Sequence, residues 1–275
     1  MKTHFFTLLS LFFSFNLMAQ NELEIYISKL DPQISVSMIL QNNKSEILFE
    51  KNSKKQVPSA SIIKIPILIT FFQQVEEKKI KGSQKHRLAE NERVGGSGDL
   101  QFEARNSTFS YLDIATKMIS VSDNTATNIL IDILGMEDIN ERIGRWEIPN
   151  TLLQRKMMDI DAVLKGKQNF TSARDSNTLL LDLLNYNILN KKNGKKALEI
   201  LFLCEDGLTI PLKIPKNIPI AHKTGTLDYV RGDSAIVFGK NTLILTIFVE
   251  NFESMEQAEL IIADLAEISY NNFGK

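Results

Sequence analysis

Residues 61–79 read SIIKIPILITFFQQVEEKK, and this segment sets the plan of the chain. Its apolar side chains recur at helical intervals and its charges collect at the far end, which predicts a long helix. Pro66 falls within the first turn and a half, where a missing backbone donor is tolerated. Residues three apart share one face of a helix, so we expect Lys64 to reach the hydroxyl of Ser61.

Lys64 lies between Ile63 and Ile65 in an apolar run, where an unpaired ammonium would be costly. A lysine paired with Ser61 is therefore favoured over the alternative, an N-cap serine followed by a solvated lysine. A serine at the amino end of a helix also directs its backbone N–H toward developing negative charge, which the helix dipole favours. The pair predicts an activated serine nucleophile.

A second motif, Ser122-Asp123-Asn124, lies between two predicted helices at 110–119 and 125–134. A connection of this kind can reach into a cleft and offer its side chains to a ligand. The same three residues also make a good helix cap, and both interpretations can hold together.

A third motif, Lys223-Thr224-Gly225-Thr226, lies in a predicted strand. The glycine permits the close approach of a substrate backbone, and the ammonium offers a fixed positive charge to a carboxylate. The alternative is an ordinary lysine on an edge strand. Arg231, shortly after this strand, is a candidate second carboxylate binder or, equally, a surface arginine at the start of a strand.

Strand patterns lie at both ends of the chain, and helical patterns fill the middle. The strand patterns occupy 34–40, 47–50, 218–222, 233–238 and 242–250, and further helical patterns occupy 172–189, 195–203 and 255–271. The polar, glycine-rich stretch 81–106 is expected to be a loop. We predict an α/β fold with an antiparallel sheet built from both chain ends and flanked by helices. An all-helical lobe at 58–204 is inserted between the two parts of the α/β lobe, 20–57 and 205–275.

The composition excludes several classes of function. With 32 basic and 33 acidic residues, the chain has no surplus charge with which to bind nucleic acid or an anionic membrane. After residue 19 the only histidines are His86 and His222, and the latter should face away from Lys223, which leaves no credible Ser-His-Asp triad. No His, Cys and carboxylate cluster has the spacing of metal ligands, so neither a metal nor a cofactor is expected.

Residues 1–19 have the pattern of a secretory signal peptide, with an apolar stretch from Phe5 to Met18 and the small residue Ala19 before polar sequence. The apolar stretch is shorter than the ~20 residues of a membrane span. We therefore expect a secreted or periplasmic protein, cleaved near Ala19, with no membrane span in its mature form, and a monomer. Cys204 is the only cysteine, which rules out an intramolecular disulfide, and its apolar neighbours at 200–203 predict a buried structural thiol.

Taken together, these motifs resemble those of class A serine β-lactamases and penicillin-binding proteins. The matching text is PSASIIK at 58–64, GSGDLQ at 96–101, VSDNTATN at 121–128 and HKTGT at 222–226, in family order and spacing. The resemblance implies an α/β sandwich with a helical lobe and an active site where the two meet.

The resemblance also implies roles for single residues. Lys64 would take part in activating Ser61, and Ser122 would relay a proton to the leaving nitrogen. Asn124 would bind the substrate amide. Lys223 and Thr224 would hold the substrate carboxylate, and the backbone N–H groups of Ser61 and Thr226 would form the oxyanion hole.

One region departs from the family. Class A β-lactamases carry a loop glutamate that directs water at the acyl-enzyme, and alignment on Asn169 places Lys156 at that position. A lysine cannot act as a negatively charged base. Asp159 or Asp161 could take the role if the loop runs differently. Otherwise acylation would be intact and hydrolysis slow.

Three functions therefore stay open. The first is β-lactam ring opening through an acyl-enzyme on Ser61, followed by hydrolysis. The second is a D-alanyl-D-alanine peptidase or related cell-wall acyltransferase acting on peptidoglycan. The third is a non-hydrolytic protein that binds β-lactams or muropeptides. The complete set of Ser61, Lys64, Ser122 and Lys223 disfavours the third, because a binder needs no such set.

Overall fold

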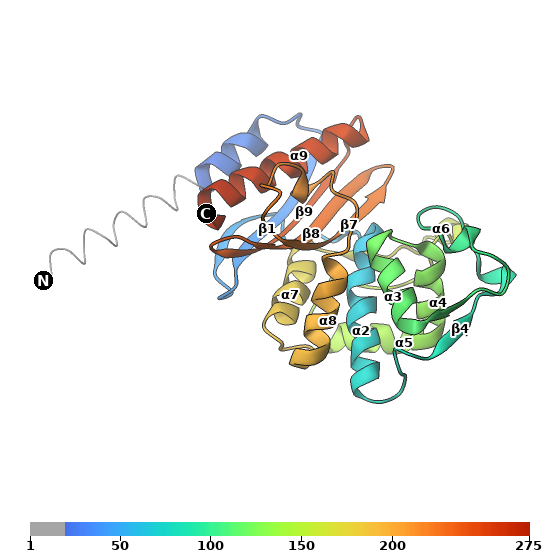
Figure 1. Ribbon diagram of the computed structural model, residues 1–275. Helices are drawn as coiled ribbons and strands as arrows, with labels where there is room; N and C mark the ends of the chain where they lie inside the picture. Colours follow the sequence, from blue (N-terminus) through green and yellow to red (C-terminus); the bar gives the residue numbers. More distant parts are fainter. Residues whose placement is uncertain (1–19) are drawn as a thin grey trace, which may run out of the picture.

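The computed structural model describes residues 20–275, and the predicted signal peptide lies outside them. The central element is an antiparallel sheet of five strands in the order β2-β1-β9-β8-β7 (Figure 1). The strands are β1 (Ser35–Asn42), β2 (Ile47–Lys51), β7 (Ile220–Leu227), β8 (Val230–Phe238) and β9 (Thr242–Glu250). Because β1 pairs with β9, both chain ends build one sheet, which confirms the predicted fold class.

One face of the sheet is covered by α9 (Met255–Ser269) and by the helical residues 20–28 (Figure 1). Apolar side chains of the strands pack in this layer against apolar side chains of α9, including Ile262 and Leu265, which are fully buried. Tyr26 donates a hydrogen bond to Asp264 over 2.8 Å and so ties the two helical segments together.

The other face carries the helical part of the molecule. Its helices are α2 (Lys64–Glu76), α3 (Tyr111–Ser120), α4 (Asn124–Leu134), α5 (Met136–Arg145), α6 (Ile160–Leu164), α7 (Ala173–Leu184) and α8 (Lys191–Leu201). α7 packs on the sheet, and α2 lies inside the helical group, where its side chains from Lys64 to Phe72 are all buried. This explains why the α2 segment is apolar on nearly every side. No helix within residues 20–275 is long and apolar enough to cross a membrane.

Several expected boundaries were wrong. The helix expected from Ser61 begins as a 3-10 turn, η1 (Ala60–Ile63), and becomes α-helical only at Lys64. The expected loop at 81–106 contains β4 (Lys85–Arg87), which pairs with β5 (Thr108–Ser110), and the short turns η2 (Glu90–Glu92) and η3 (Leu100–Phe102). Strand β7 continues to Leu227, because its partner β8 begins at Val230 and the two pair over their whole length.

Short pieces of structure bring the chain to the amino end of α2. β3 (Val57–Pro58) pairs with β6 (Phe170–Thr171), and Ser59 donates its N–H to the carbonyl of Asn169 over 2.9 Å. A 3-10 turn, η4 (Ile210–Leu212), and a π turn, η5 (Tyr270–Gly274), complete the described elements. The η1 turn is thereby held between the sheet and the helical part.

Candidate active site

The side chains of Ser61 and Lys64 meet at the start of α2. The Lys64 Nζ lies 2.9 Å from the Ser61 Oγ. Ala60, just before the serine, has a φ of 45°, which lies in the left-handed region that an L residue rarely adopts. The chain therefore turns sharply into the 3-10 turn, and Ser61 is left half-buried at its mouth while Lys64 is completely buried behind it.

Ser122 and Asn124 complete the surroundings of the Lys64 amine. Lys64 Nζ lies 2.7 Å from the carbonyl oxygen of Ser122, 3.0 Å from its Oγ and 3.1 Å from the Oδ1 of Asn124. Ser122 has a φ of 55°, and this left-handed conformation turns both of its oxygens toward the lysine. The sequence placed these residues in one site from separate motifs, and the structure brings them within hydrogen-bonding distance of one nitrogen.

The electrostatics favour a neutral amine at Lys64. Burial is the largest cause that holds the pKa of Lys64 well below its ordinary value of 10.5. The positive charge of Lys223 lowers this pKa further, and Asp123 opposes both effects. A neutral amine can accept a proton from the Ser61 hydroxyl, so the arrangement is suited to general-base activation of the serine.

The connection that bears Ser122 is held by its neighbour Asp123. One carboxylate oxygen of Asp123 accepts from the N–H of Ala126 over 2.7 Å and so caps α4, as the sequence allowed. The other accepts from the N–H of Leu100 over 2.8 Å. Gly98 lies against this carboxylate, and a Cβ added there would stand 2.3 Å from it. The glycine-rich turn is therefore required so that residues 95–100 can pack onto the motif.

Strand β7 forms the opposite side of the site. Gly225 lies against the nucleophile turn, because a Cβ there would come within 3.0 Å of the carbonyl oxygen of Ser59. Gly225 therefore allows the close approach of the backbone at Ser59, whereas the sequence predicted the approach of a substrate backbone. Lys223 is fully buried and donates to the carbonyl of Thr224 over 2.9 Å. Burial lowers the pKa of Lys223, with negative groups nearby opposing the shift.

These elements enclose a cavity of about 400 Å³. Its lining includes both serines and the strand residues that the sequence singled out, and it adds several that the sequence did not. The lining residues are Ser61, Ser97, Ser120, Val121, Ser122, Cys204, Glu205, Asp206, Lys223, Thr224 and Thr226. A substrate in this space would contact the nucleophile, the second hydroxyl and a fixed positive charge at once.

Arg231 is placed differently from its expected role. Its guanidinium is 2% exposed and pairs with Asp206 at 2.8 Å and with Glu259 at 3.1 Å. It also donates to the Oγ1 of Thr226 over 2.7 Å. The side chain thus already has two protein carboxylates, and Thr226 is its link to the cavity.

The loop between α5 and α6 places Lys156 differently from its expected position. Its ammonium lies 2.6 Å from Asp132 on the outer side of α4, so it does not face the nucleophile. The buried residue is the next one, Met157, whose N–H and carbonyl are both bonded by the side chain of Asn128, at 2.7 and 3.0 Å. Alignment on Asn169 gave no hint of this, because the contact joins residues 29 apart in the chain.

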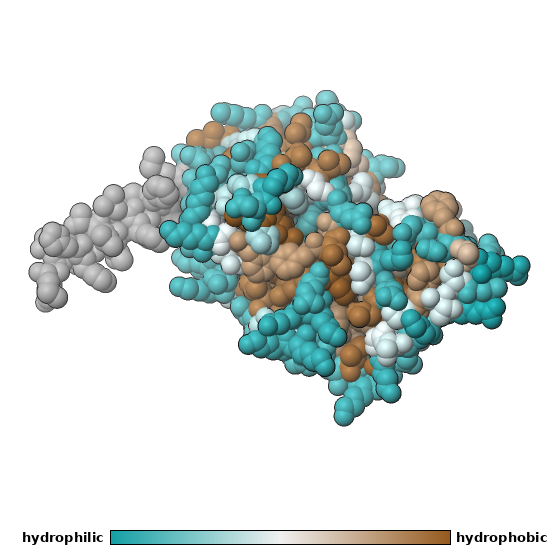
Figure 2. Space-filling view, viewed as in Figure 1, coloured by the Kyte–Doolittle hydropathy of each residue, from teal (hydrophilic) through white to brown (hydrophobic). Residues whose placement is uncertain are grey.

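The two loop aspartates lie in and beside α6. Asp159 is the N-cap of this helix and accepts from the N–H of Ala162 over 2.9 Å, and Asp161 is exposed in its first turn. Neither is among the described residues that line the cavity. Their neighbours are exposed and apolar, and Figure 2 shows hydrophobic colouring at the corner of the molecule where Figure 1 labels α6. These neighbours are Met158, Ile160, Val163 and Leu164.

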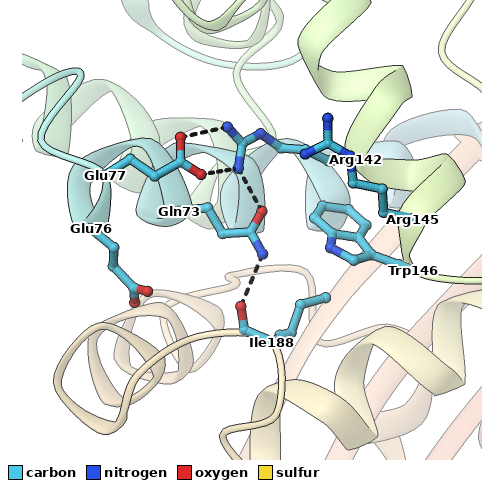
Figure 3. Close-up of a pocket in the computed structure, with 7 residues that line it drawn as sticks. All are labelled: Gln73, Glu76, Glu77, Arg142, Arg145, Trp146 and Ile188. Atoms are coloured by element: carbon cyan, nitrogen blue, oxygen red, sulfur yellow. Dashed lines mark hydrogen bonds and ion pairs between the residues drawn. The ribbon is translucent and has the colours of Figure 1, made fainter.

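A second hollow, of about 380 Å³, lies between α2, α5 and the turn before α8, and Trp146 is half-buried in its wall (Figure 3). Arg142 crosses it and makes a two-point ion pair with Glu77, at 2.7 and 2.9 Å, as the dashed lines show. Arg142 also bonds Gln73, which in turn donates to the carbonyl of Ile188. The polar side chains that line this hollow thus bond one another, which is typical of a structural ion-pair network.

Within residues 20–275 no group of three or more His, Cys, Asp or Glu side chains is arranged to hold a metal ion. The sequence did miss one group beside the cavity. Cys204 is half-buried on the cavity wall, contrary to the expected buried structural thiol, and His222 is paired with Asp233 instead of being isolated. The pairing of β7 with β8 brings His222 and Asp233 together, and Cys204 comes from the segment after α8.

A family model described as the beta-lactamase enzyme family matches residues 18–273. Beta-lactamase VEB-1 of Pseudomonas aeruginosa is 25% identical, over 97% of this chain and 96% of its own length. Among solved structures, PBP-A is 26% identical with a TM-score of 0.83, covering 94% of this chain and 96% of its own. A leucine-to-glutamate variant of PBP-A, solved as its acyl-enzyme complex with penicillin G, superposes with a TM-score of 0.82 at 26% identity and the same coverage.

Proposed function

Because the chain belongs to the class A serine β-lactamase family, we propose that it opens β-lactam rings through an acyl-enzyme on Ser61. The observation that supports this most directly is the 2.9 Å contact between the Ser61 Oγ and the buried Lys64 amine. The depressed pKa of Lys64 keeps the amine able to take the hydroxyl proton as the oxygen attacks the lactam carbonyl. Named β-lactamases among the relatives agree with this substrate class.

The reaction then follows from the neighbouring groups. As the Ser61 Oγ bonds to the carbonyl carbon, the backbone N–H groups of Ser61 and Thr226 stabilise the oxyanion. The ring C–N bond breaks, and the nitrogen takes a proton from the Ser122 hydroxyl. Ser122 recovers a proton from Lys64, whose Nζ lies 3.0 Å from its Oγ. Both proton transfers therefore pass through one amine.

Binding is assigned to the rest of the set. Lys223 and Thr224 hold the substrate carboxylate, since Lys223 supplies a buried positive charge and Thr224 lines the cavity. Arg231 contributes through Thr226, which it contacts at 2.7 Å. Asn124 binds the substrate amide from its place beside Lys64. No cofactor is required, and the protein is proposed to act as a secreted or periplasmic monomer after cleavage near Ala19.

Deacylation is proposed to be slow, because neither Asp159 nor Asp161, the candidate bases of the loop before and in α6, is among the described residues lining the cavity. A missing positioned base costs about 100-fold to 10,000-fold in rate. The same observation favours a second function, a D-alanyl-D-alanine peptidase or cell-wall acyltransferase, which would use the same groups on peptidoglycan. A non-hydrolytic binder is the third.

Nitrocefin and penicillin G test these alternatives by stopped-flow absorbance and by intact-mass spectrometry over time. We expect a burst of about one product equivalent per enzyme, an acylated mass, and then slow return of the free mass. Ser61→Ala should show no acylated mass and an unchanged fold, because the N-caps of η1 and α2 are Ser59 and Ile63 and the substitution removes neither.

A D-alanyl-D-alanine peptide tested in parallel separates the first two functions. Release of D-alanine faster than penicillin hydrolysis would favour the peptidase. Reversible binding without any acylated mass would favour the binder and overturn the proposal.

A further inference from the structure

Beside the Ser61 cavity lies a second group of reactive side chains that the proposed reaction does not use. Cys204, His222 and Asp233, here called the Cys204 cluster, come from the segment after α8, from β7 and from β8. The His222 Nδ1 lies 3.1 Å from both carboxylate oxygens of Asp233. Both residues are buried, with 3% and 0% of their surfaces exposed. The histidine is therefore held firmly by one of its two ring nitrogens.

Asp233 is fixed in turn by other partners. Its Oδ2 accepts from the Oγ1 of Thr209 over 2.7 Å and from the N–H of Ile210 over 3.2 Å. With Nδ1 directed at this carboxylate, the second ring nitrogen of His222 is left for Cys204, which is close enough for the imidazole to lower the pKa of the thiol. A nucleophile, a histidine and an orienting carboxylate in sequence are the arrangement that activates a cysteine.

The position of Cys204 gives this arrangement access to small molecules. The residue is half-buried and lines the same cavity as Ser61, Ser122 and Lys223. A merely structural thiol would be enclosed by apolar side chains, but the neighbours Phe202 and Leu203 are 41% and 51% exposed. Cys204 thus lies on the wall of a cavity of about 400 Å³ rather than inside the core.

From this geometry we propose that Cys204 is a modification site for small-molecule disulfides, and that the resulting mixed disulfide closes the Ser61 cavity to substrate. The thiol proton passes to His222, and the Cys204 sulfur attacks one sulfur of the disulfide R–S–S–R. The R–S–S–R bond breaks, Cys204–S–S–R forms, and the thiolate RS⁻ leaves and takes a proton from water. The disulfide is the only oxidant, and a thiol reductant reverses the step.

The charges around the cluster agree with this step. Burial acts to raise the pKa of the Cys204 thiol, but His222 and Lys223 outweigh it and the pKa is lowered. Burial acts in the opposite sense on His222, yet Asp233 and Cys204 together raise its pKa to about 10. The cluster therefore favours a thiolate beside an imidazolium, which is the reactive form of a cysteine.

The closing of the cavity rests on the proposed function, whereas the reactivity of the thiol does not. The first measurement is therefore independent of β-lactams. The protein is mixed with dithiobis(nitrobenzoate) at neutral pH, and the coloured thiolate is followed by absorbance. We expect one equivalent to be released about tenfold or more faster than with free glutathione, and none with Cys204→Ser.

Because the probe is anionic and Lys223 is nearby, uncharged hydroxyethyl disulfide is run in parallel, with the adduct followed by intact mass. The same advantage over glutathione with both reagents supports an activated thiol. His222→Gln should remove most of the advantage while Cys204 stays accessible to iodoacetamide in a folded protein. If His222→Gln fails to fold, the comparison of the wild type with glutathione still decides. A rate no greater than that of glutathione overturns the proposal.

The second measurement tests closure. Protein carrying the hydroxyethyl adduct is exposed to fluorescent penicillin, and we expect labelling of Ser61 to fall at least tenfold and to return after dithiothreitol. Cys204→Ser, treated identically, should label at its untreated rate. Undiminished labelling of the adduct would overturn the closure. If untreated protein takes up no penicillin at all, the proposed function fails, while release of the coloured thiolate still reports on Cys204.

Discussion

Substitution of Met157 by glutamate is expected to speed release of the acyl group, whereas the same substitution at Lys156 is not. Asn124 and Asn128 lie one turn apart on the same face of α4. Asn124 contacts the Lys64 amine at 3.1 Å, and Asn128 bonds the backbone of Met157 at 2.7 and 3.0 Å. The backbone of Met157, whose side chain is 8% exposed, is therefore held about one helical turn from the point where Asn124 contacts the general base.

The expected magnitudes follow from burial. A carboxylate positioned to direct water contributes about 100-fold to 10,000-fold, so the rate after the burst should rise within that range in Met157→Glu. The buried charge and lost packing should cost about 3 kcal/mol of unfolding free energy, or roughly 6–12 °C in Tm. Lys156→Glu instead sets like charges against Asp132 at a site where both side chains are 40% or more exposed, so its cost stays near 1 kcal/mol.

The assay is the slow phase of nitrocefin turnover, checked by the decay of the acylated mass after penicillin G. Met157→Gln is the matched control, since it has the shape of the glutamate without its charge. The reasoning fails if Met157→Gln turns over as fast as Met157→Glu. It fails equally if Lys156→Glu gains tenfold while Met157→Glu gains nothing, because the loop would then present the opposite side chain to the site.

Three further outcomes are expected. Lys64→Arg should slow acylation by about 100-fold or more, because a guanidinium cannot take the serine proton, and fluorescent penicillin measures this; near-normal labelling would make the lysine structural. Arg142→Met should lower the unfolding free energy by about 2–4 kcal/mol in urea, since it leaves Glu77 without its two-point partner, while Arg145→Met, exposed by 69%, should change it by less than about 0.5 kcal/mol. The pKa of His222 rises from 6.5 to about 10 on folding, so its stabilisation is complete below pH 6.5 and lost as pH approaches 10. The Tm difference between the wild type and His222→Gln should shrink across that window, and a constant difference would contradict the assignment.

The sequence predicts well those features that depend on neighbours in the chain. The strand at 242–250 has the bounds expected from its pattern, and the helix expected at 125–134 ends at Leu134 as predicted. The helix expected at 110–119 begins with a capping box, in which Ser110 and Asp113 bond each other's backbone at 3.1 and 2.9 Å. Each of these features is decided within about five residues, so a local pattern is sufficient.

Features decided by distant contacts could not be predicted in this way. The 3-10 start of the nucleophile turn depends on the approach of Gly225 to Ser59, and these residues are joined only once the sheet has formed. In the loop before α6, Met157 is the buried residue because its backbone is bonded by Asn128, which lies on α4. Cys204 was expected to be buried because its neighbours are apolar, but α8 ends at Leu201 and the chain leaves the core there.

The place of β9 in the sheet affects how the protein is made. This strand, residues 242–250, lies between β1 and β8, so the middle of the sheet comes from a segment far downstream of β1 in the chain. A growing chain can form the β1–β2 hairpin early, but β1 has no second neighbour until β9 has been made. Pairing between segments so distant in sequence is slow, because a long loop must close first. The surroundings of Ser61 on β7 are therefore complete only after β7, β8 and β9 have paired.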